Sequence, residues 1–228
     1  MKQIKKISAL IVLMVAVSFS YAQESKTREV PNAPAFSAIE VIGGDINVYF
    51  TQGNTHSFSI NGPAKLVKAT KVKVKANTLF VEYQEPFFTG DDNDVSLYVT
   101  APTLTRISVS GEADFESKTA FQGQELTIKT RQSGEVSMEN VTVERLNIDA
   151  KGSSSVDVDY VEAKKVRISS LDRAEVEVTG NTAQVEIADK GMFAEIDTGK
   201  LLITKTPGEN NTAGRVAKDG SVEFSFDD

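Results

Sequence analysis

A short repeat between Leu104 and Ile203, with a period of about 20 residues, constrains the fold of this chain more than any other feature of its sequence. In each unit a small residue is followed by apolar residues at alternate positions. The small residues that open the units are Gly111, Gly134, Ser154, Ala174 and Ala194, and the apolar residues two positions later are Ala113, Val136, Val156, Val176 and Ile196. A fixed period of this length, carried by alternating apolar residues, is typical of proteins whose successive units stack on one another.

The pattern predicts an all-β fold, and specifically a right-handed parallel β-helix (β-solenoid) with rungs of about 20 residues. Each unit holds two or three short alternating segments, which match the strands of one rung, and small or polar residues that match its corners. Residues 36–103 show the same alternation with frequent turn residues, so their strands are expected to continue or cap the stack. The one Ala/Lys-rich stretch, 64–69, follows Pro63 and is expected to form at most two turns of helix.

The chain divides into five segments on composition. Residues 1–22 combine three lysines, a short apolar core and a small-residue ending, which predicts a signal peptide cleaved before Gln23. Residues 23–35 are polar with two prolines and are expected to be a flexible leader. Residues 36–228 are expected to form a single domain, with N-terminal strands in 36–103, repeat rungs in 104–203, and a loop and C-terminal cap in 204–228. The chain is therefore expected to be exported, to the periplasm, the cell surface or the medium.

Charge and cysteine content exclude several classes of function. The chain has no cysteine, so disulfides, thiolate metal sites and a lipid-modified cysteine are impossible. Its formal charge is −7, and removal of the three lysines of residues 1–22 would make it −10. Nucleic acid is therefore not expected as a partner, because bulk electrostatics would oppose its binding. No segment after residue 22 is apolar over the length that a transmembrane helix needs.

The mature sequence resembles the putative auto-transporter adhesin, head GIN domain family of secreted bacterial proteins. The resemblance rests on segments 36–39, 41–48, 79–81 and 104–111 and on the corner segments that recur after them. The Gly-Ile-Asn core appears here as Gly44-Asp45-Ile46-Asn47, with one residue inserted, and the Ser-Gly corners become less regular in the later units. The resemblance implies a β-helix-like envelope protein with an adhesive or carbohydrate-binding role. It brings no catalytic or binding residues with it.

The outward positions of the repeat are strongly acidic. If the units stack about 4.8 Å apart, carboxylates would lie above one another and each neighbouring pair would repel by roughly 1 kcal/mol. This face is a candidate for binding Ca²⁺ or a cationic partner, although it is also consistent with a solvated surface that prevents aggregation. Its candidate residues are Glu112, Asp114, Glu135, Asp157, Glu175, Glu177, Glu195 and Asp197.

Other possible sites have weaker sequence support. The acidic run 91–94 lacks the spacing of a calcium-binding loop, and His56, the only histidine, has no accompanying nucleophile motif. Exposed aromatic side chains would be the expected platform for a sugar. The candidates are Tyr49, Phe87, Phe88, Tyr98 and Tyr160, although most aromatic residues in a β protein pack in its core.

Three functions are compatible with these features. The first is a non-enzymatic adhesin-like module of the cell envelope that recognises a glycan or a protein along a sheet face. The second is a polysaccharide lyase or hydrolase built on a β-helix, which only analogy of fold supports. The third is a structural envelope module with no small ligand. No cofactor is expected, and Ca²⁺ at the acidic face is the one candidate.

Overall fold

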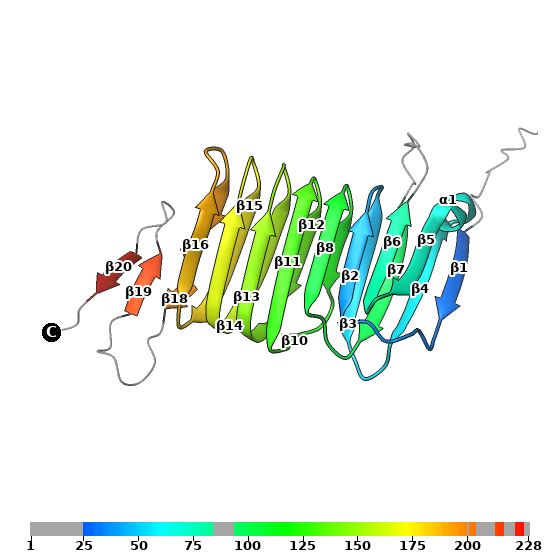
Figure 1. Ribbon diagram of the computed structural model, residues 1–228, viewed down its shortest axis with the longest axis horizontal. Helices are drawn as coiled ribbons and strands as arrows, with labels where there is room; N and C mark the ends of the chain where they lie inside the picture. The colour runs from blue at the N-terminus through cyan, green and yellow to red at the C-terminus, as the bar shows by residue number, and fades with distance from the viewer. Residues whose placement is uncertain (1–24, 84–93, 200, 204–212, 217–221, 226–228) are drawn as a thin grey trace, which may run out of the picture.

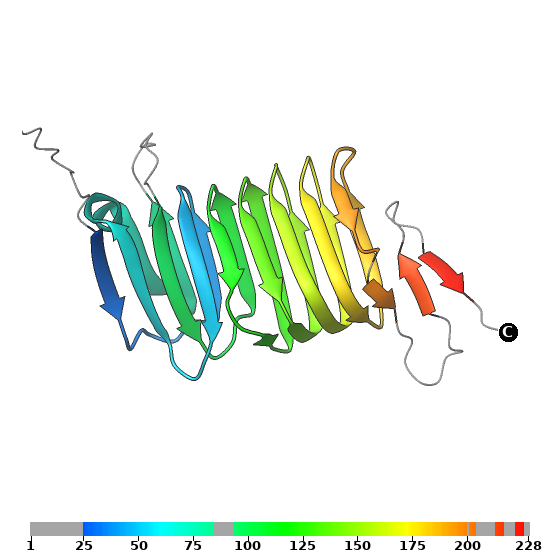
Figure 2. The ribbon, with the colours of Figure 1, turned by 180° about the vertical axis from the view of Figure 1, so that it is seen from behind.

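The structure is a computed structural model that describes residues 25–83, 94–199, 201–203, 213–216 and 222–225. Strands lie side by side across the long axis of an elongated molecule, in two layers that are seen from opposite sides in Figures 1 and 2. The elements are β1 (Ser25–Val30), β2 (Ala38–Ile42), β3 (Ile46–Gln52), β4 (Ser57–Pro63), α1 (Ala64–Ala69), β5 (Thr70–Lys75), β6 (Thr78–Tyr83), β7 (Val95–Ala101), β8 (Arg106–Gly111), β9 (Asp114–Ser117), β10 (Phe121–Gln122), β11 (Glu125–Gln132), β12 (Glu135–Glu139), β13 (Val141–Ala150), β14 (Ser155–Ser170), β15 (Glu175–Thr182), β16 (Val185–Lys190), β17 (Glu195–Asp197), β18 (Leu201–Ile203), β19 (Ala213–Val216) and β20 (Val222–Ser225).

Within the repeat, the corresponding strands of successive units pair in parallel and in register. In the pairing of β11 with β13, Leu126 lies opposite Leu146 and Ile128 lies opposite Ile148. In the pairing of β14 with β16, Ile168 lies opposite Ile187, only 19 residues later, and the register shifts directly after this pair. The period of the sequence repeat therefore sets which strands are neighbours.

The pairings define three ladders. The first ladder follows the order β5, β6, β2, β8, β11, β13, β14 and β16. The second ladder follows the order β1, β4, β7, β3, β9, β12, β14, β15 and β17. The third joins β10, β13, β14, β15, β18, β19 and β20. The long strands β13, β14 and β15 each contribute to more than one ladder.

The core consists of apolar side chains stacked along the ladders. One inner column of the first ladder holds Leu79, Ile39, Ile107, Ile128, Ile148, Ile168 and Ile187. The matching column of the second ladder holds Leu97, Val48, Phe115, Val136, Val156, Val176 and Ile196. All of these side chains are buried except Ile187, which is half-buried on the last strand of its ladder. The all-β prediction and the inward phase of the repeat are thus confirmed.

The prediction of a right-handed parallel β-helix is wrong. The strands form a mixed, open sheet, in which β1 with β4, β4 with β7, and β5 with β6 are antiparallel, as are β18 with β19 and β19 with β20. The third ladder begins only at β10, so not every unit contributes to all three ladders. Period-2 alternation reports which face of a strand is buried, but it is the same for parallel and antiparallel neighbours, so it could not reveal this change of direction.

Residues 25–30, which were expected to lie in a flexible leader, form β1 instead. β1 pairs along its whole length with β4, yet five of its six side chains are exposed. Such a strand is held by backbone hydrogen bonds and leaves no apolar pattern in the sequence. His56 anchors the chain that follows β1, because its Nε2 lies 3.0 Å from the Phe36 carbonyl oxygen and its ring packs edge-on against Phe36.

One local prediction for the N-terminal part is confirmed. The segment after Pro63 forms the short helix α1. Strands β5 and β6 form an antiparallel hairpin whose turn residues Ala76 and Asn77 both have positive φ angles, of 47° and 60°. Two consecutive residues of this kind are typical of a type I′ turn. Among the described residues, no helix is long and apolar enough to cross a membrane.

Stacked corners require glycine at one position in particular. Gly111 has a φ of 91°, and a Cβ atom at this position would lie 2.7 Å from the Cα atom of Gly43. The Gly43 amide donates a hydrogen bond of 2.9 Å to the Ser110 carbonyl oxygen, so the two corners are in direct contact. A side chain at Gly111 would both strain the backbone and separate the corners.

The C-terminal segment continues the third ladder. A loop and a C-terminal cap were predicted for 204–228, and β19 and β20 form an antiparallel pair that extends the third ladder from β18. Residues 204–212, 217–221 and 226–228 lie outside the described residues, as does the predicted signal peptide.

The alternation makes a direct stability prediction. Val156 is 0% exposed, so Val156→Asp would place a carboxylate in the apolar column, whereas Asp157→Val changes an outward side chain. We expect Val156→Asp to lower the free energy of unfolding by about 3–5 kcal/mol or to prevent folding. Asp157→Val should change it by less than about 1 kcal/mol in chemical denaturation. Equal losses for the two variants would contradict the assigned phase.

Candidate functional site: the acidic face

The outward side chains of the second ladder form a continuous acidic surface, which we call the acidic face. One column contains Asn47, Asp114, Glu135, Ser155, Glu175 and Glu195. The next contains Tyr98, Tyr49, Glu116, Ser137, Asp157, Glu177 and Asp197. A short third column contains Glu139 and Asp159. Parallel in-register pairing therefore places carboxylates on successive strands, about 4.8 Å apart.

Seven of the eight sequence-predicted residues lie on this face, and Glu112 does not. The sequence alignment of the units placed Glu112 in the column of Glu135, but the residue opposite Glu135 is Asp114. The alignment began the first unit at Gly111, but the counterpart of Gly134 is Ala113, so the aligned first unit is offset by two positions. Glu112 is exposed in that corner.

The acidic face lacks basic residues on its repeat strands. β9, β12, β15, β17 and residues 155–159 of β14 contain no lysine or arginine. Lys118, just after β9, pairs with Glu116, and Thr179 donates a 2.7 Å hydrogen bond to Asp159. Within the described ranges, neither hydrogen bonds nor ion pairs engage the side chains of Asp114, Glu135, Glu139, Asp157, Glu175, Glu177 and Glu195.

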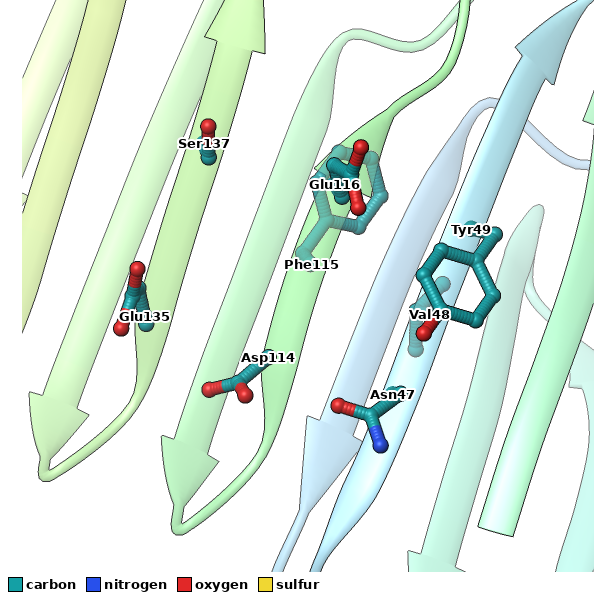
Figure 3. A pocket seen from close by; sticks show the side chains of 8 residues that line it. All are labelled: Asn47, Val48, Tyr49, Asp114, Phe115, Glu116, Glu135 and Ser137. Atoms are coloured by element: carbon teal, nitrogen blue, oxygen red, sulfur yellow. The ribbon is translucent and has the colours of Figure 1, made fainter. Parts of the chain in front are cut away.

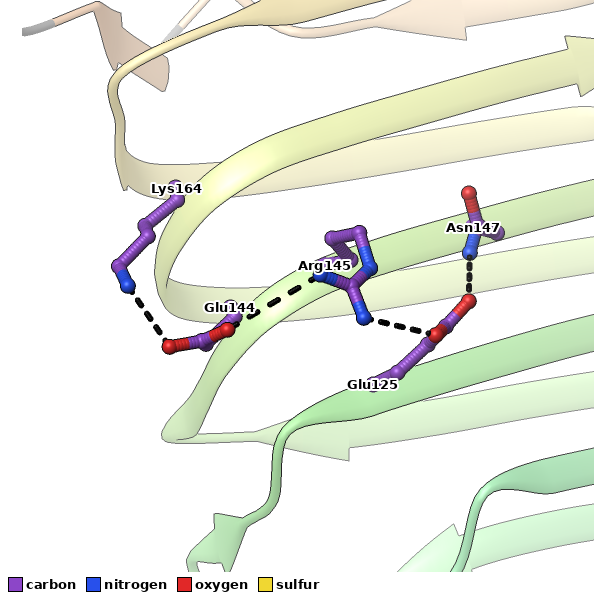
Figure 4. A network of polar contacts seen from close by, with 5 residues as sticks. All are labelled: Glu125, Glu144, Arg145, Asn147 and Lys164. Atoms are coloured by element: carbon purple, nitrogen blue, oxygen red, sulfur yellow. Dashed lines mark hydrogen bonds and ion pairs between the residues drawn. The ribbon is translucent and has the colours of Figure 1, made fainter.

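The opposite outer surface, on the first ladder, is organised differently. Its carboxylates are interspersed with basic residues, and we call it the mixed-charge face. Arg145 lies 3.1 Å from Glu125 and 3.9 Å from Glu144, and Glu144 accepts a 2.7 Å contact from Lys164 (Figure 4). Glu186 is paired with both Lys165 and Arg167. The same stacking therefore concentrates negative charge on the acidic face, whereas on the mixed-charge face basic residues neutralise the carboxylates.

The pKa values of the carboxyl groups follow this difference. On the acidic face, partial burial raises the pKa of Asp114, and the negative charges of Glu135, Asp45 and Asp94 raise it further. Burial also raises the pKa of Asp157, with Asp159, Glu177, Glu135 and Glu139 adding to the effect. The Oδ1 atom of Asp157 is buried without a hydrogen-bond partner.

On the mixed-charge face the shift has the opposite sign. A hydrogen bond and the charge of Lys164 lower the pKa of Glu144, and the same two effects of Lys165 lower the pKa of Glu186. Both glutamates are accessible to solvent, so these ion pairs contribute little to stability. Their importance here is that they remove net charge from this face.

A hollow of about 280 Å³ lies at the N-terminal end of the acidic face. Figure 3 shows its polar side chains in two rows across β3, β9 and β12: Asn47, Asp114 and Glu135 form one row, and Tyr49, Glu116 and Ser137 form the other. Val48 and Phe115 form its apolar floor. Sequence reasoning missed Asn47, because β3 does not belong to the repeat and its place beside β9 is a tertiary contact.

Of the aromatic candidates for a sugar platform, the structure brings two together. The Tyr49 and Tyr98 ring centroids are 5.2 Å apart, and Tyr98 is 50% exposed. Tyr160 is also exposed but lies at a separate turn with a positive φ angle. Phe87 and Phe88 lie outside the described residues, as do three of the four residues of the 91–94 acidic run.

The geometry offers no preformed metal centre in the part of the chain that the structure describes. Histidine and acidic side chains there do not form a group of three or more that could hold a metal ion. Extended strands hold successive carboxylates apart in a flat lattice, whereas Ca²⁺ requires six to eight oxygen ligands converging on one point. The acidic face is therefore better suited to a partner that carries its positive charges at several positions.

Comparison with known proteins assigns the chain to a family. Residues 35–217 match the model of the family described as "Putative auto-transporter adhesin, head GIN domain", and the chain belongs to this family. The resemblance inferred from the sequence is thereby confirmed. Membership of an adhesin-like family indicates an extracellular or envelope location. No curated protein matches the chain.

Solved structures share the fold at low sequence identity. A crystal structure described as a putative adhesin from Parabacteroides distasonis has a TM-score of 0.71 and 17% identity, covering 81% of this chain and 77% of its own. A second from the same organism, described as a putative lipid binding protein, has a TM-score of 0.68 and 17% identity, covering 79% and 76%. A putative adhesin from Bacteroides fragilis has a TM-score of 0.60 and 21% identity, covering 77% and 97%.

The raised pKa values predict how stability depends on pH. A carboxyl group whose pKa is higher in the folded than in the unfolded chain binds protons more readily when folded. Its full destabilising effect is therefore present only above its folded pKa, and that effect decreases as the pH falls. Asp114 and Asp157 should therefore make the protein more stable as the pH falls from 7 toward the range just above the ordinary aspartate value. The lowered pKa values of Glu144 and Glu186 act in the opposite sense: the stability that they contribute is present above the ordinary glutamate value of 4.5 and is lost as the pH falls below it toward their folded pKa values. Thermal unfolding between pH 7 and 4.5 measures this, and a melting temperature that falls throughout would contradict it.

The repulsion at Asp157 can be tested by removing one charge. Asp157→Asn keeps the shape of the side chain and removes its interaction with the surrounding carboxylates, so we expect a gain of about 0.5–1 kcal/mol at pH 7. The matched control is Asp149→Asn on the mixed-charge face, where Asp149 lies 3.7 Å from both Arg131 and Lys151. That variant should be neutral or slightly destabilising. If both changes destabilise equally in urea unfolding, carboxylate repulsion on the acidic face is absent.

Proposed function

We propose that this protein is a non-enzymatic, adhesin-like module of the cell envelope that binds a basic surface of a partner protein through the acidic face. The observation that carries this proposal is the difference between the two outer faces of one repeat. Along columns of the first ladder acidic residues lie beside basic ones, as Glu125 does beside Arg145 and Glu186 beside Arg167. Along a column of the second ladder the charged residues all share one sign: Asp114, Glu135, Glu175 and Glu195.

Solubility alone does not account for this difference. Both faces are exposed sheet surfaces, and both need polar side chains to remain in water. The mixed-charge face meets that need with paired charges, at no electrostatic cost. On the acidic face, partial burial and the charges of neighbouring carboxylates together raise the pKa of Asp114 and Asp157, so this face keeps an electrostatic cost that a cationic partner would reduce.

A basic protein fits this surface better than a glycan does. The carboxylates repeat at about the 4.8 Å strand spacing over five strands, so the column extends over roughly 20 Å. A protein segment with several lysine or arginine side chains can engage such a column at many points and be steered toward it over a longer range. An acidic polysaccharide would be repelled, and a neutral one would contact many hydrogen-bond acceptors but few donors.

Export is part of the proposal. The signal peptide predicted for residues 1–22 would deliver the chain to the cell envelope, in agreement with the location that the adhesin-like family indicates. A periplasmic or surface location would expose the acidic face to proteins of the envelope or of another cell.

The proposal predicts that removal of charge from the acidic face abolishes binding to a cationic probe. The test variant combines Glu135→Gln, Glu175→Gln and Glu195→Gln. The control combines Glu125→Gln, Glu144→Gln and Glu186→Gln, which changes the net charge equally on the mixed-charge face. Binding of an oligolysine peptide, measured by biolayer interferometry, should weaken at least about tenfold in the test variant and less than about threefold in the control. Raising the salt concentration from 20 to 300 mM should weaken wild-type binding strongly.

Three results would overturn this function. Equal weakening in the two triple variants would show that net charge, and not the acidic face, attracts the probe. Binding of a neutral glycan that is unaffected by the test variant would favour a lectin. Turnover of a polysaccharide by the pure protein would establish an enzyme instead. Melting curves of both variants show whether the fold is intact.

A further inference from the structure

The hollow differs from the rest of the acidic face in having an aromatic wall and depth. It lies where the acidic columns of the repeat meet β3, so its lining comes from three parallel strands (Figure 3). Tyr49 and Asn47 bound it on one side, Glu135 and Ser137 on the other, and Asp114 lies between them. This is the place on the face where a single side chain from a partner can be surrounded rather than merely contacted.

The polar lining consists mainly of hydrogen-bond acceptors. Asn47, Asp114, Glu135 and Ser137 all present oxygen atoms, and within the described chain none of these four side chains has a hydrogen-bond or ion-pair partner. No lysine or arginine lines the hollow. Asp45 and Asp94 lie near enough to raise the pKa of Asp114, so they add to the negative potential. An ammonium group, with three N–H donors and a positive charge, matches this lining.

The Tyr49 ring already accommodates an ammonium group. The Lys118 Nζ atom lies over the ring, 4.6 Å from its centroid, while also pairing with Glu116. This contact shows that the π face of Tyr49 binds a cation, and because Lys118 of the same chain occupies it, a partner's lysine has to take the place of Lys118 there. The ring also offers an apolar surface against which an alkyl chain can lie.

We infer that the hollow is a subsite for a primary ammonium group, with a lysine side chain of the partner as its ligand. The ammonium lies between the Asp114 and Glu135 carboxylates, within reach of the Asn47 and Ser137 oxygens, and the methylene chain packs along Tyr49. Binding of the ammonium group in the hollow relieves the repulsion between Asp114 and Glu135, and this relief favours binding there over binding elsewhere on the acidic face. The inference deepens the proposed function and rests on it for the identity of the partner.

The test uses a single lysine side chain as the probe. Nα-acetyl-lysine amide is titrated into the ¹⁵N-labelled protein at pH 7, and the backbone amide shifts of Asn47, Tyr49, Asp114 and Glu135 are followed. The comparison ligands are Nε-acetyl-lysine amide and norleucine amide, each with its α-amine acetylated, which lack the side-chain charge. We expect saturable shifts that centre on the hollow with the first compound and none with the other two.

Matched variants establish where the probe binds. Asp114→Asn removes one carboxylate from the hollow, and Asp189→Asn makes the same chemical change on the mixed-charge face. Tyr49→Leu removes the ring and retains an apolar side chain, with Tyr160→Leu as its control. We expect Asp114→Asn and Tyr49→Leu to weaken binding of the probe at least about fivefold, while the two control variants leave it within about twofold of wild type.

The outcomes separate this inference from the proposed function. If oligolysine depends on the acidic face but the lysine amide gives no shifts at the hollow, the subsite is wrong and the proposed function stands. If the lysine amide binds at the hollow but oligolysine ignores the acidic face, the subsite is real and the basic protein partner is wrong. Equal binding by Asp114→Asn and Asp189→Asn would overturn the subsite, as would equal binding of the Nε-acetylated compound.

Discussion

Parallel, in-register pairing between the corresponding strands of successive units is the interaction on which the rest of this structure depends. Because each residue lies beside its counterpart in the next unit, a favourable side chain is repeated and so is an unfavourable one. In the core, repetition produces the isoleucine column from Ile39 to Ile187 and the valine-rich column that includes Val156. Each apolar residue there is covered by an equivalent one above and below, so the core extends with every unit.

Outside the core the same rule makes identical charges neighbours, and the two faces resolve this differently. The first ladder places opposite charges on neighbouring strands and gains pairs such as that of Arg145 with Glu125. The second ladder repeats the sign and interrupts it only with Ser137 and Ser155. The contrast lies within single units, where the chain passes from one face to the other in a few residues. It therefore reflects a property of the acidic face and not of the overall composition.

The sequence predicted the buried positions well, because the alternation of Val136 and Val156 with acidic neighbours has only one consistent phase. It also located most of the acidic face, since Glu135, Glu175 and Glu195 follow that phase. It misplaced Glu112, because the first unit was aligned on Gly111 although Ala113 is the counterpart of Gly134, and it missed β1, five of whose six side chains are exposed. Two further features depend on long-range pairing, which a local sequence pattern does not contain. They are the direction of the strands at both ends and the position of Asn47 and Tyr49 beside β9. The mixed-charge face could have been predicted from the sequence, because Glu125, Arg145 and Lys165 occupy the same position in successive units.

The most direct test of this account is a titration of individual carboxyl groups by ¹³C-detected NMR, with and without an oligolysine peptide. The account predicts that Asp114 and Asp157 titrate above the ordinary aspartate pKa while Glu144 and Glu186 titrate below the ordinary glutamate pKa. Addition of the peptide should lower the pKa of the two aspartates and leave those of the two glutamates unchanged. Ordinary pKa values for all four groups, or an equal response to the peptide on both faces, would contradict the claim that one face carries an uncompensated charge for a cationic partner.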